Sequence, residues 1–345
     1  MRTAHLGTMM IGSGYPVRVQ TMYDEPIPHG EEAQTALLKR LNVLKAMGCD
    51  IIRFSYPHAE DHDAFSFLCS HSPMPVVADI HFDYKLALDS LSCGARKIRI
   101  NPGNIGAKWK VEEVVRSAKD HDAAIRIGLN SGSLPREGNA DPVVRMVESA
   151  LEYLSWFDSW GFSNTVVSLK SSNPEECYRA AKLFASRSDC PLHLGVTEAG
   201  SVVSSVTRST WVLGRLLSEG IGSTLRISIT GPIETEVQAG VELLRTLGLK
   251  KGGIRIVSCP RCGRCSFDSQ GFLAQVEPKL LAIDKDLCVA IMGCQVNGPG
   301  EASHSDIAIT GIGKSVFLYE KGVLKQEVKR EDAEEVLLKA IADYE

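Results

Sequence analysis

Short runs of β-branched and apolar residues alternate with longer amphipathic stretches along the first 250 residues of the chain. This alternation is typical of βα units that build a parallel sheet. Eight such strands with their helices account for about 250 residues, which is the size of one TIM barrel. The predicted strands are Val17–Met22, Asp50–Ser55, Val76–His81, Lys97–Asn101, Ile125–Leu129, Thr165–Lys170, Leu192–Val196 and Thr224–Ile229.

The stretches between these runs have apolar residues at helical spacing, and several end on a glycine that suits a C-cap (Gly48, Gly94 and Gly220). The pattern therefore predicts helices that cover the outside of the barrel. They are Glu31–Met47, Lys85–Ser92, Val111–Lys119, Pro142–Ser155, Pro174–Ser186, Ser205–Glu219 and Val237–Leu247.

The pattern changes after Gly248–Gly253, whose sequence GLKKGG is typical of a linker. The last part of the chain predicts a small α+β fold, and we expect two domains: a TIM barrel at 1–250 and an α+β domain at 251–345. Its predicted elements are strands at Ile254–Val257, Leu287–Met292, Asp306–Thr310 and Val316–Tyr319, and helices at Phe272–Leu281 and Glu331–Tyr344.

Composition excludes several classes of partner. The chain has 345 residues, 38 Lys and Arg against 42 Asp and Glu, and a net charge of −4, so it lacks the basic excess of a nucleic-acid-binding protein. No apolar run approaches the ~18 residues that span a bilayer, and the first twenty residues contain no signal-peptide core. We expect a cytoplasmic protein with no membrane and no nucleic-acid partner.

Long cationic side chains occur within or at the end of five predicted strands, where a barrel interior normally holds Val, Ile and Leu. Because side chains alternate along a strand, each shares its face with a polar neighbour. Converging buried cations require a matching anion, and guanidinium groups favour a phosphate or diphosphate ester. The alternative is that they point into the helical layer or pair with structural carboxylates. The five are Arg53, Arg99, Arg126, Lys170 and Arg226.

Acid–base groups follow two further strands. Asp79 and His81 lie in VADIHFD, and His193 and Glu198 lie in PLHLGVTEAG. We expect these groups to orient hydroxyls or move protons, although a single histidine at a strand end is usually a packing residue. The segment PHAEDHD, which contains His62, indicates a solvated helix start rather than a metal site.

The ten cysteines are unevenly distributed. Five are scattered (Cys49, Cys69, Cys93, Cys177 and Cys190), and we interpret them as buried free thiols. The other five lie between positions 259 and 294, where Cys288 is expected in the core of a strand.

The segment CPRCGRC begins at Cys259, directly after a predicted strand, and Cys294 follows another strand in GCQVNGPGE. Four thiolates would suit a 4Fe-4S cluster or zinc, and redox disulfide chemistry is a third possibility. A structural zinc site usually repeats the C-x-x-C pair, which this chain does not, so the spacing favours iron–sulfur. Spacing alone selects Cys265 as the fourth ligand, with Cys259, Cys262 and Cys294.

Six segments in this order, VADIHFDYKLAL, RINPGNIG, PLHLGVTEAG, LLSEGIGSTLRIS, CPRCGRC and GCQVNGPGEA, closely resemble the 4-hydroxy-3-methylbut-2-enyl diphosphate synthase family. The likeness covers nearly the whole chain. It implies a TIM barrel that binds 2-C-methyl-D-erythritol 2,4-cyclodiphosphate and a second domain with a 4Fe-4S cluster. The implied reaction is a two-electron reductive ring opening with loss of the C3 hydroxyl as water.

The resemblance also implies roles for individual residues. The cluster ligands would be Cys259, Cys262, Cys294 and Glu301, with Cys265 as an extra thiol. Asp79, Asn101, His193 and Glu198 would contact the hydroxyl-bearing carbons or move the proton. The implied diphosphate cradle is Arg53, Arg99, Arg126, Asn130, Lys170, Arg226 and Ser228.

The resemblance further implies a homodimer, in which the cluster domain of one subunit caps the barrel of the other, and reduction by flavodoxin or ferredoxin. Two alternatives come from other classes. One is a barrel that binds a phosphorylated or pterin substrate, with zinc stabilising the second domain. The other is an iron–sulfur electron carrier or sensor without catalytic activity.

Overall fold

The computed structural model describes residues 2–133, 141–260, 262–294, 296, 298–312 and 315–344. The chain divides into two compact units, Met1–Lys250 and Lys251–Glu345. No helix in the described ranges is long and apolar enough to cross a membrane.

The first unit is built on a ring of eight parallel strands, which confirms the predicted TIM barrel. Neighbours in the ring follow chain order, β10 pairs with both β3 and β9, and a bridge between Val167 and Leu192 joins β8 to β9. The strands are β3 (Arg18–Met22), β4 (Ile51–Ser55), β5 (Val76–Asp79), β6 (Lys97–Ile100), β7 (Ala124–Asn130), β8 (Thr165–Lys170), β9 (His193–Leu194) and β10 (Thr224–Leu225).

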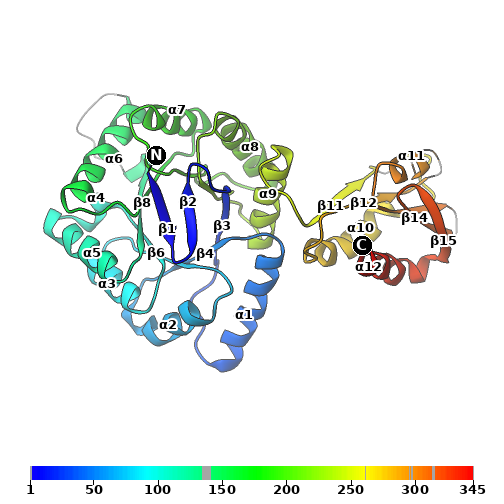
Figure 1. Ribbon diagram of the computed structural model, residues 1–345, viewed down its shortest axis with the longest axis horizontal. Helices are drawn as coiled ribbons and strands as arrows, with labels where there is room; N and C mark the ends of the chain where they lie inside the picture. The colour runs from blue at the N-terminus through cyan, green and yellow to red at the C-terminus, as the bar shows by residue number, and fades with distance from the viewer. Residues whose placement is uncertain are drawn as a thin grey trace. The chain divides into compact units, whose positions relative to one another are not determined.

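Helices surround this ring (Figure 1). The outward side chains of the strands, such as Ile98, Ile125 and Ile127, share one hydrophobic core with the inner faces of the helices. This packing leaves alternate side chains of every strand pointing into the barrel. The helices are α1 (Glu31–Ala46), α2 (His62–His71), α3 (Tyr84–Ser92), α4 (Pro102–Ile105), α5 (Lys108–Asp120), α6 (Pro142–Ser159), α7 (Pro174–Ala185), α8 (Val202–Ser218) and α9 (Ile233–Thr246).

A hairpin of β1 (Thr3–Leu6) and β2 (Met9–Gly12), which the sequence pattern does not predict, closes the N-terminal end of the barrel. Its apolar side chains pack on inward-facing residues near the starts of the strands: Ala4, Leu6 and Ile11 with Ile51, Val77, Ala124 and Val166. The Asn164 side chain holds the hairpin by accepting from the His5 N–H (2.8 Å) and donating to the His5 carbonyl (3.1 Å). The barrel interior is therefore apolar at this end.

The second unit is a five-stranded sheet in chain order, β11 (Ile254–Ser258), β12 (Leu287–Met292), β13 (Ile307–Ile312), β14 (Ser315–Glu320) and β15 (Val323–Lys329). The first three strands are parallel and the last two antiparallel. Strand β15 escapes prediction because all its residues except Val328 are exposed, which leaves no apolar alternation. The helices are α10 (Ser269–Leu281), α11 (Gly298–Ala302) and α12 (Ala333–Asp343).

Candidate active site

A small cavity of about 130 Å³ lies where the barrel strands end, and polar side chains form nearly all of its wall. The C-terminal ends of the strands are the face at which TIM barrels place their active sites. The structure brings all five predicted strand cations to this wall. The lining residues are Arg53, Asp79, His81, Arg99, Arg126, Asn130, Ser168, Lys170, Val196, Thr197, Arg226 and Ser228.

Strand register explains why these side chains converge. Arg99 on β6 lies opposite Asp79 on β5 and opposite Arg126 on β7, at one level of the barrel. The residues on either side of Arg126 are Ile125 and Ile127, which pack outward against helices, so Arg126 must face inward. The isoleucines thus decide the direction of the arginine.

Two glycines make room for the cations. A Cβ at Gly128 would clash with the Arg99 side chain, and a Cβ at Gly195 would lie 2.8 Å from Lys170 Nζ and 2.7 Å from the Arg226 carbonyl. A larger side chain at either position would displace a cation that lines the cavity. Glycine is required here for close approach rather than for an unusual backbone angle.

The wall carries more positive than negative charge. Arg53, Arg99, Arg126 and Lys170 are each less than a tenth exposed. Burial lowers the pKa of Arg53 to about 10 and lowers the pKa values of Arg126 and Lys170, and nearby guanidinium groups reinforce the shift at these two. An anion that entered the cavity would remove this mutual repulsion.

Two carboxylates balance part of the charge. Asp79 lies 3.5 Å from Arg99 and 3.3 Å from the His81 ring. Burial alone would raise the pKa of Asp79, but the guanidinium groups of Arg53 and Arg99 hold it well below its usual range. Arg226 is paired with Glu236 on α9, at 2.9 Å and 2.7 Å. Arg226 therefore pairs with a structural carboxylate, which was the alternative explanation for the strand cations. It nevertheless lines the cavity.

Arg126 has no ion pair of this kind in the described part of the chain, and Asp79 favours its charge only from a distance. Arg126 is 1% exposed, and its Nε and Nη1 atoms have no hydrogen-bond partner within the described part of the chain. A buried guanidinium with unused donors is costly, and it is most simply explained by an anionic ligand.

Three other predicted residues lie outside the cavity wall. Asn101 caps α4 by accepting from the Gly103 N–H (3.1 Å). His193 is buried one layer deeper, two residues before Gly195, with Nδ1 2.8 Å from the Thr224 hydroxyl and no partner for Nε2 among the described groups. Burial, aided by Arg126 and Lys170, lowers the pKa of His193, so the imidazole is neutral. Glu198 is exposed beside Thr197, with a φ of 53° that is rare for glutamate.

Sequence reasoning misses Lys97 and Glu236. Lys97 is fully buried in the barrel, 3.3 Å from Gln20 Oε1, and burial lowers its pKa. Its position two residues before Arg99 gives it the same inward face, so strand alternation contained the signal. Glu236 gave no signal, because a glutamate in the first turn of a helix is ordinary.

Two of the predicted cluster ligands follow the C-terminal ends of neighbouring strands in the second sheet. β11 and β12 are parallel neighbours with Ser258 opposite Ile291, so Cys259 and Cys294 follow the same ends of adjacent strands. Cys259 packs against a small cluster that includes Met292 and Ala302, and Ala302 is the residue after Glu301 on α11. Cys262 is exposed and Cys294 is buried.

Cys265 is oriented differently. Its thiol donates to the Phe267 carbonyl at 2.8 Å, and a Cβ at Gly293 would clash with its sulfur. The Cys265 side chain therefore packs between Phe267 and Gly293, and the family resemblance selects Glu301 rather than Cys265 as the fourth ligand. Three cysteines and one glutamate form a donor set that fits an iron–sulfur cluster, whose ligands bind separate irons.

A search of the described residues for His, Cys, Asp and Glu ligand atoms within 4.8 Å of one another finds His62, Asp89 and Cys93. The solvated helix start predicted at PHAEDHD is therefore an incomplete interpretation. Helix α2 does begin at His62, but its ring contacts Asp89 on α3. As predicted, the scattered cysteines are unpaired thiols; Cys69 is half-buried and the other four are buried.

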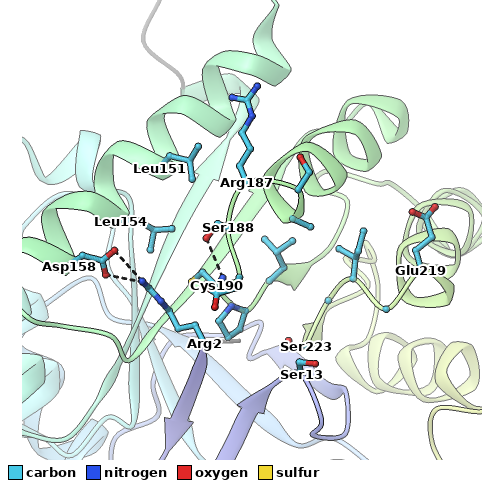
Figure 2. A pocket seen from close by; sticks show the side chains of 18 of the residues that line it. Arg2, Ser13, Leu151, Leu154, Asp158, Arg187, Ser188, Cys190, Glu219 and Ser223 are labelled. Carbon is cyan, nitrogen blue, oxygen red and sulfur yellow. Dashed lines mark hydrogen bonds and ion pairs between the residues drawn. The ribbon is translucent and has the colours of Figure 1, made fainter.

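A larger cavity lies elsewhere. It has a volume of about 780 Å³ and opens near the starts of β9 and β10, where Figure 2 shows the Arg2 and Asp158 side chains joined as an ion pair (2.9 Å) beside Cys190 and Ser223. It contains none of the predicted site residues. Cavity size alone would have selected the opposite end of the barrel from the predicted site residues.

Comparisons with known proteins match the two parts of the chain to two family models. Residues 1–241 match the family model of the GcpE TIM-barrel domain, and residues 255–343 match that of the GcpE protein C-terminal domain.

Curated relatives match over nearly the whole chain. Proteins of Treponema denticola (42% identical, 99% of this chain and 95% of the relative), Geobacter sulfurreducens (42%, 98% and 96%) and Caldanaerobacter subterraneus (43%, 99% and 96%) are similar to it. Each is named 4-hydroxy-3-methylbut-2-en-1-yl diphosphate synthase (flavodoxin).

Solved structures of dihydropteroate synthases from Yersinia pestis and Xanthomonas albilineans are similar to the barrel. Both have a TM-score of 0.52 and cover 72% of this chain and 97% of the solved chain, at 10% and 12% identity. This likeness shows the fold alone.

Proposed function

The chain belongs to the GcpE family, and we infer that it is an oxidoreductase of isoprenoid biosynthesis. It converts 2-C-methyl-D-erythritol 2,4-cyclodiphosphate into 4-hydroxy-3-methylbut-2-enyl diphosphate. The reaction adds two electrons, opens the ring at a C–O bond to phosphate and releases the C3 hydroxyl as water. The product keeps the diphosphate as a linear ester.

We propose that the cavity at the barrel mouth binds the cyclic diphosphate. The observation that carries this assignment is buried Arg126, whose Nε and Nη1 atoms have no partner among the described residues and which lies among Arg53, Arg99 and Lys170. Guanidinium groups donate two parallel hydrogen bonds to phosphate oxygens, and a diphosphate carries more negative charge than a carboxylate to balance several cations. Asn130, Ser228 and Arg226 complete the proposed cradle on the same wall.

Within this cradle, Asp79 and Arg226 have fixed directions before the substrate enters. The low pKa of Asp79 keeps it ionised, so it accepts hydrogen bonds from substrate hydroxyls rather than donating a proton. Asn101 supports the adjoining turn through its cap of α4 and is proposed to contact the substrate when bound.

A proton must reach the departing hydroxyl. We assign its delivery to Glu198, which is exposed at the mouth beside Thr197 of the cavity wall. His193 is neutral and buried, so we assign it a positioning role rather than proton exchange with solvent. Its Nε2 atom, which has no partner among the described groups, would hold a neighbouring group in place.

We propose that Cys259, Cys262, Cys294 and Glu301 hold a 4Fe-4S cluster. When bound, such a cluster supplies the two electrons of the reaction one at a time. The four ligands differ in how firmly they bind. The three thiolates would hold iron tightly, whereas the carboxylate of Glu301 would be an oxygen ligand that exchanges more readily and could free one coordination position. Glu301 is counted among the catalytic residues for this reason.

The proposed partners follow from the family. Flavodoxin appears in the relatives' names and is the preferred reductant, with ferredoxin as the alternative. We propose a homodimer in the cytoplasm, with no nucleic-acid or membrane partner.

The decisive experiment is an anaerobic assay. Purified protein should be brown and contain about four irons per chain, and with dithionite and the cyclic diphosphate it should form the linear allylic diphosphate. Omission of dithionite should abolish product, and R126M should abolish substrate binding while it retains iron. Iron-free protein, or iron-loaded protein that leaves the substrate unchanged, would overturn the proposal.

A further inference from the structure

A group of ligating side chains lies outside the barrel cavity, between helices α2 and α3. His62 is the first residue of α2, Asp89 lies on α3, and Cys93 is the C-cap of α3. The His62 Nδ1 atom is 2.8 Å from Asp89 Oδ1 and 3.3 Å from Cys93 Sγ. We propose that these three side chains bind a zinc ion.

The local structure explains the convergence. Asp89 and Cys93 are four residues apart, so they lie on the same face at the end of α3. Cys93 is 5% exposed, whereas the side chains of Asp89 and His62 are 28% and 43% exposed. The thiol therefore forms the floor of the site, and an ion can reach it from solvent past the histidine.

The donor set selects the metal. Zinc binds imidazole nitrogen, carboxylate oxygen and thiolate sulfur, and its sites with three protein ligands keep a fourth position for water. Calcium and magnesium require oxygen ligands, of which the three side chains offer only the carboxylate. A divalent ion with one carboxylate, one thiolate and a neutral imidazole has no net charge, which suits a partly buried site between two helices.

Tyr56 supplies the outer partner that such a site needs. Its hydroxyl donates to Asp89 Oδ2, which leaves Oδ1 directed at His62. Tyr56 is 1% exposed and packs on Phe65 with ring centroids 4.8 Å apart, so the donor cannot move far. Hydrogen bonds of this kind orient ligating carboxylates and raise metal affinity.

The competing explanation is a chain of hydrogen bonds from Tyr56 through Asp89 and His62 to Cys93, with no ion. Zinc bonds of about 2.0 Å to nitrogen and oxygen place tetrahedral ligands about 3.3 Å apart. The observed 2.8 Å between His62 and Asp89 is close to this value, and a small rotation of the half-exposed ring makes up the difference. The two explanations differ in a measurable quantity, the zinc bound per chain.

The test uses the full chain with its iron content measured at the same time. The protein is equilibrated with zinc and freed of unbound metal by gel filtration. Its zinc and iron contents are then measured by inductively coupled plasma mass spectrometry. The wild type should carry one more zinc per chain than H62A, D89N or C93S, with equal iron in all four. H71A and C69S are matched controls in the same helix, α2, and should retain the zinc.

Two further readouts separate a ligand from a structural residue. Y56F should weaken zinc binding about 10- to 100-fold, measured by competition with a chelating dye, without abolishing it. Cobalt in place of zinc should give a thiolate-to-cobalt charge-transfer band in the wild type that is absent in C93S. Equal zinc in the wild type and H62A, or an unchanged cobalt band in C93S, would overturn the proposal. If C93S fails to fold, H62A decides, because that side chain is half-exposed.

Discussion

Glu236 holds Arg226 through two hydrogen bonds, Nε to Oε2 at 2.9 Å and Nη2 to Oε1 at 2.7 Å. The same carboxylate also accepts from the Thr21 hydroxyl (2.7 Å) and the Ile229 N–H (3.0 Å). It therefore links β3, the segment after β10, and α9 around one arginine of the barrel mouth. Arg226 contributes a fixed direction to the cavity rather than an uncompensated charge.

E236Q should lower the free energy of unfolding by about 3 kcal/mol, because the neutral amide removes the carboxylate charge beside a largely buried guanidinium and replaces one acceptor oxygen by a donor. Urea denaturation of the substrate-free protein measures this. D158N, which breaks the half-exposed pair with Arg2, is the control and should cost less than about 1 kcal/mol. Equal losses in the two variants would mean that burial adds nothing to the Glu236 pair.

R126M should have opposite effects on stability and binding. Replacement of the unpaired buried cation by an apolar side chain of similar length should raise the free energy of unfolding by about 1–3 kcal/mol without substrate. Affinity for the cyclic diphosphate, measured by calorimetry, should fall at least about 100-fold. R116M on the exposed face of α5 is the control, with changes within about 0.5 kcal/mol. A destabilised R126M would show that its donors are satisfied in solution.

G128A should displace Arg99, because the added methyl group would occupy the space of the arginine side chain. We expect KM for the cyclic diphosphate to rise about 10-fold or more, by loss of a charge-assisted contact worth about 1.5–3 kcal/mol. G132A has open space around its added Cβ and should leave KM unchanged. Unchanged KM in G128A would indicate that Arg99 does not contact substrate.

H193Q should change the pH dependence of stability. The pKa of His193 is lowered in the folded state, so its contribution is fully present above the unfolded value near ~6.5 and is lost as the pH falls below it. Stability of the wild type should therefore decline more steeply than that of H193Q between pH 6.5 and 5, in urea titrations at each pH. H71Q, at the exposed end of α2, should follow the wild type. Parallel curves for the wild type and H193Q would show that the folded protein protonates this imidazole readily.

C265S should retain the full iron content and brown colour, since the Cys265 thiol is turned toward Phe267 and Gly293. C259S should lose both. Glu301→Ala should retain a cluster with most of the turnover lost, measured by iron analysis and product formation. Loss of iron in C265S with full activity in Glu301→Ala would instead restore the ligand set that spacing alone suggests.

Much of the fold could be predicted from local sequence patterns. Apolar residues at alternate positions, as in Ile125 and Ile127, fix which face of a strand meets the helices, and this places Arg126 inside the barrel. The same rule would have found Lys97. Ordered motifs indicated the family, and glycines and cysteines after strands indicated where the two sites begin.

The lengths of the strands and the hairpin that closes the barrel were harder to predict from the sequence. β9 and β10 end after Leu194 and Leu225, well before the predicted Val196 and Ile229. Each strand of the β1–β2 hairpin is too short to show a clear alternation of apolar and polar residues. The role of its apolar face is visible only in the fold, where that face packs on the starts of four strands.

The sequence by itself determined the alternation of strands and helices, the inward direction of the cations and the positions of the cysteines, because each depends on neighbours within a few residues. The tertiary structure alone decided which carboxylate neutralises Arg226, that Arg126 stays unpaired, and that His62 meets Cys93. These contacts join residues that only helix packing brings together, and the free energy of a buried charge depends on the groups around it in space rather than along the chain.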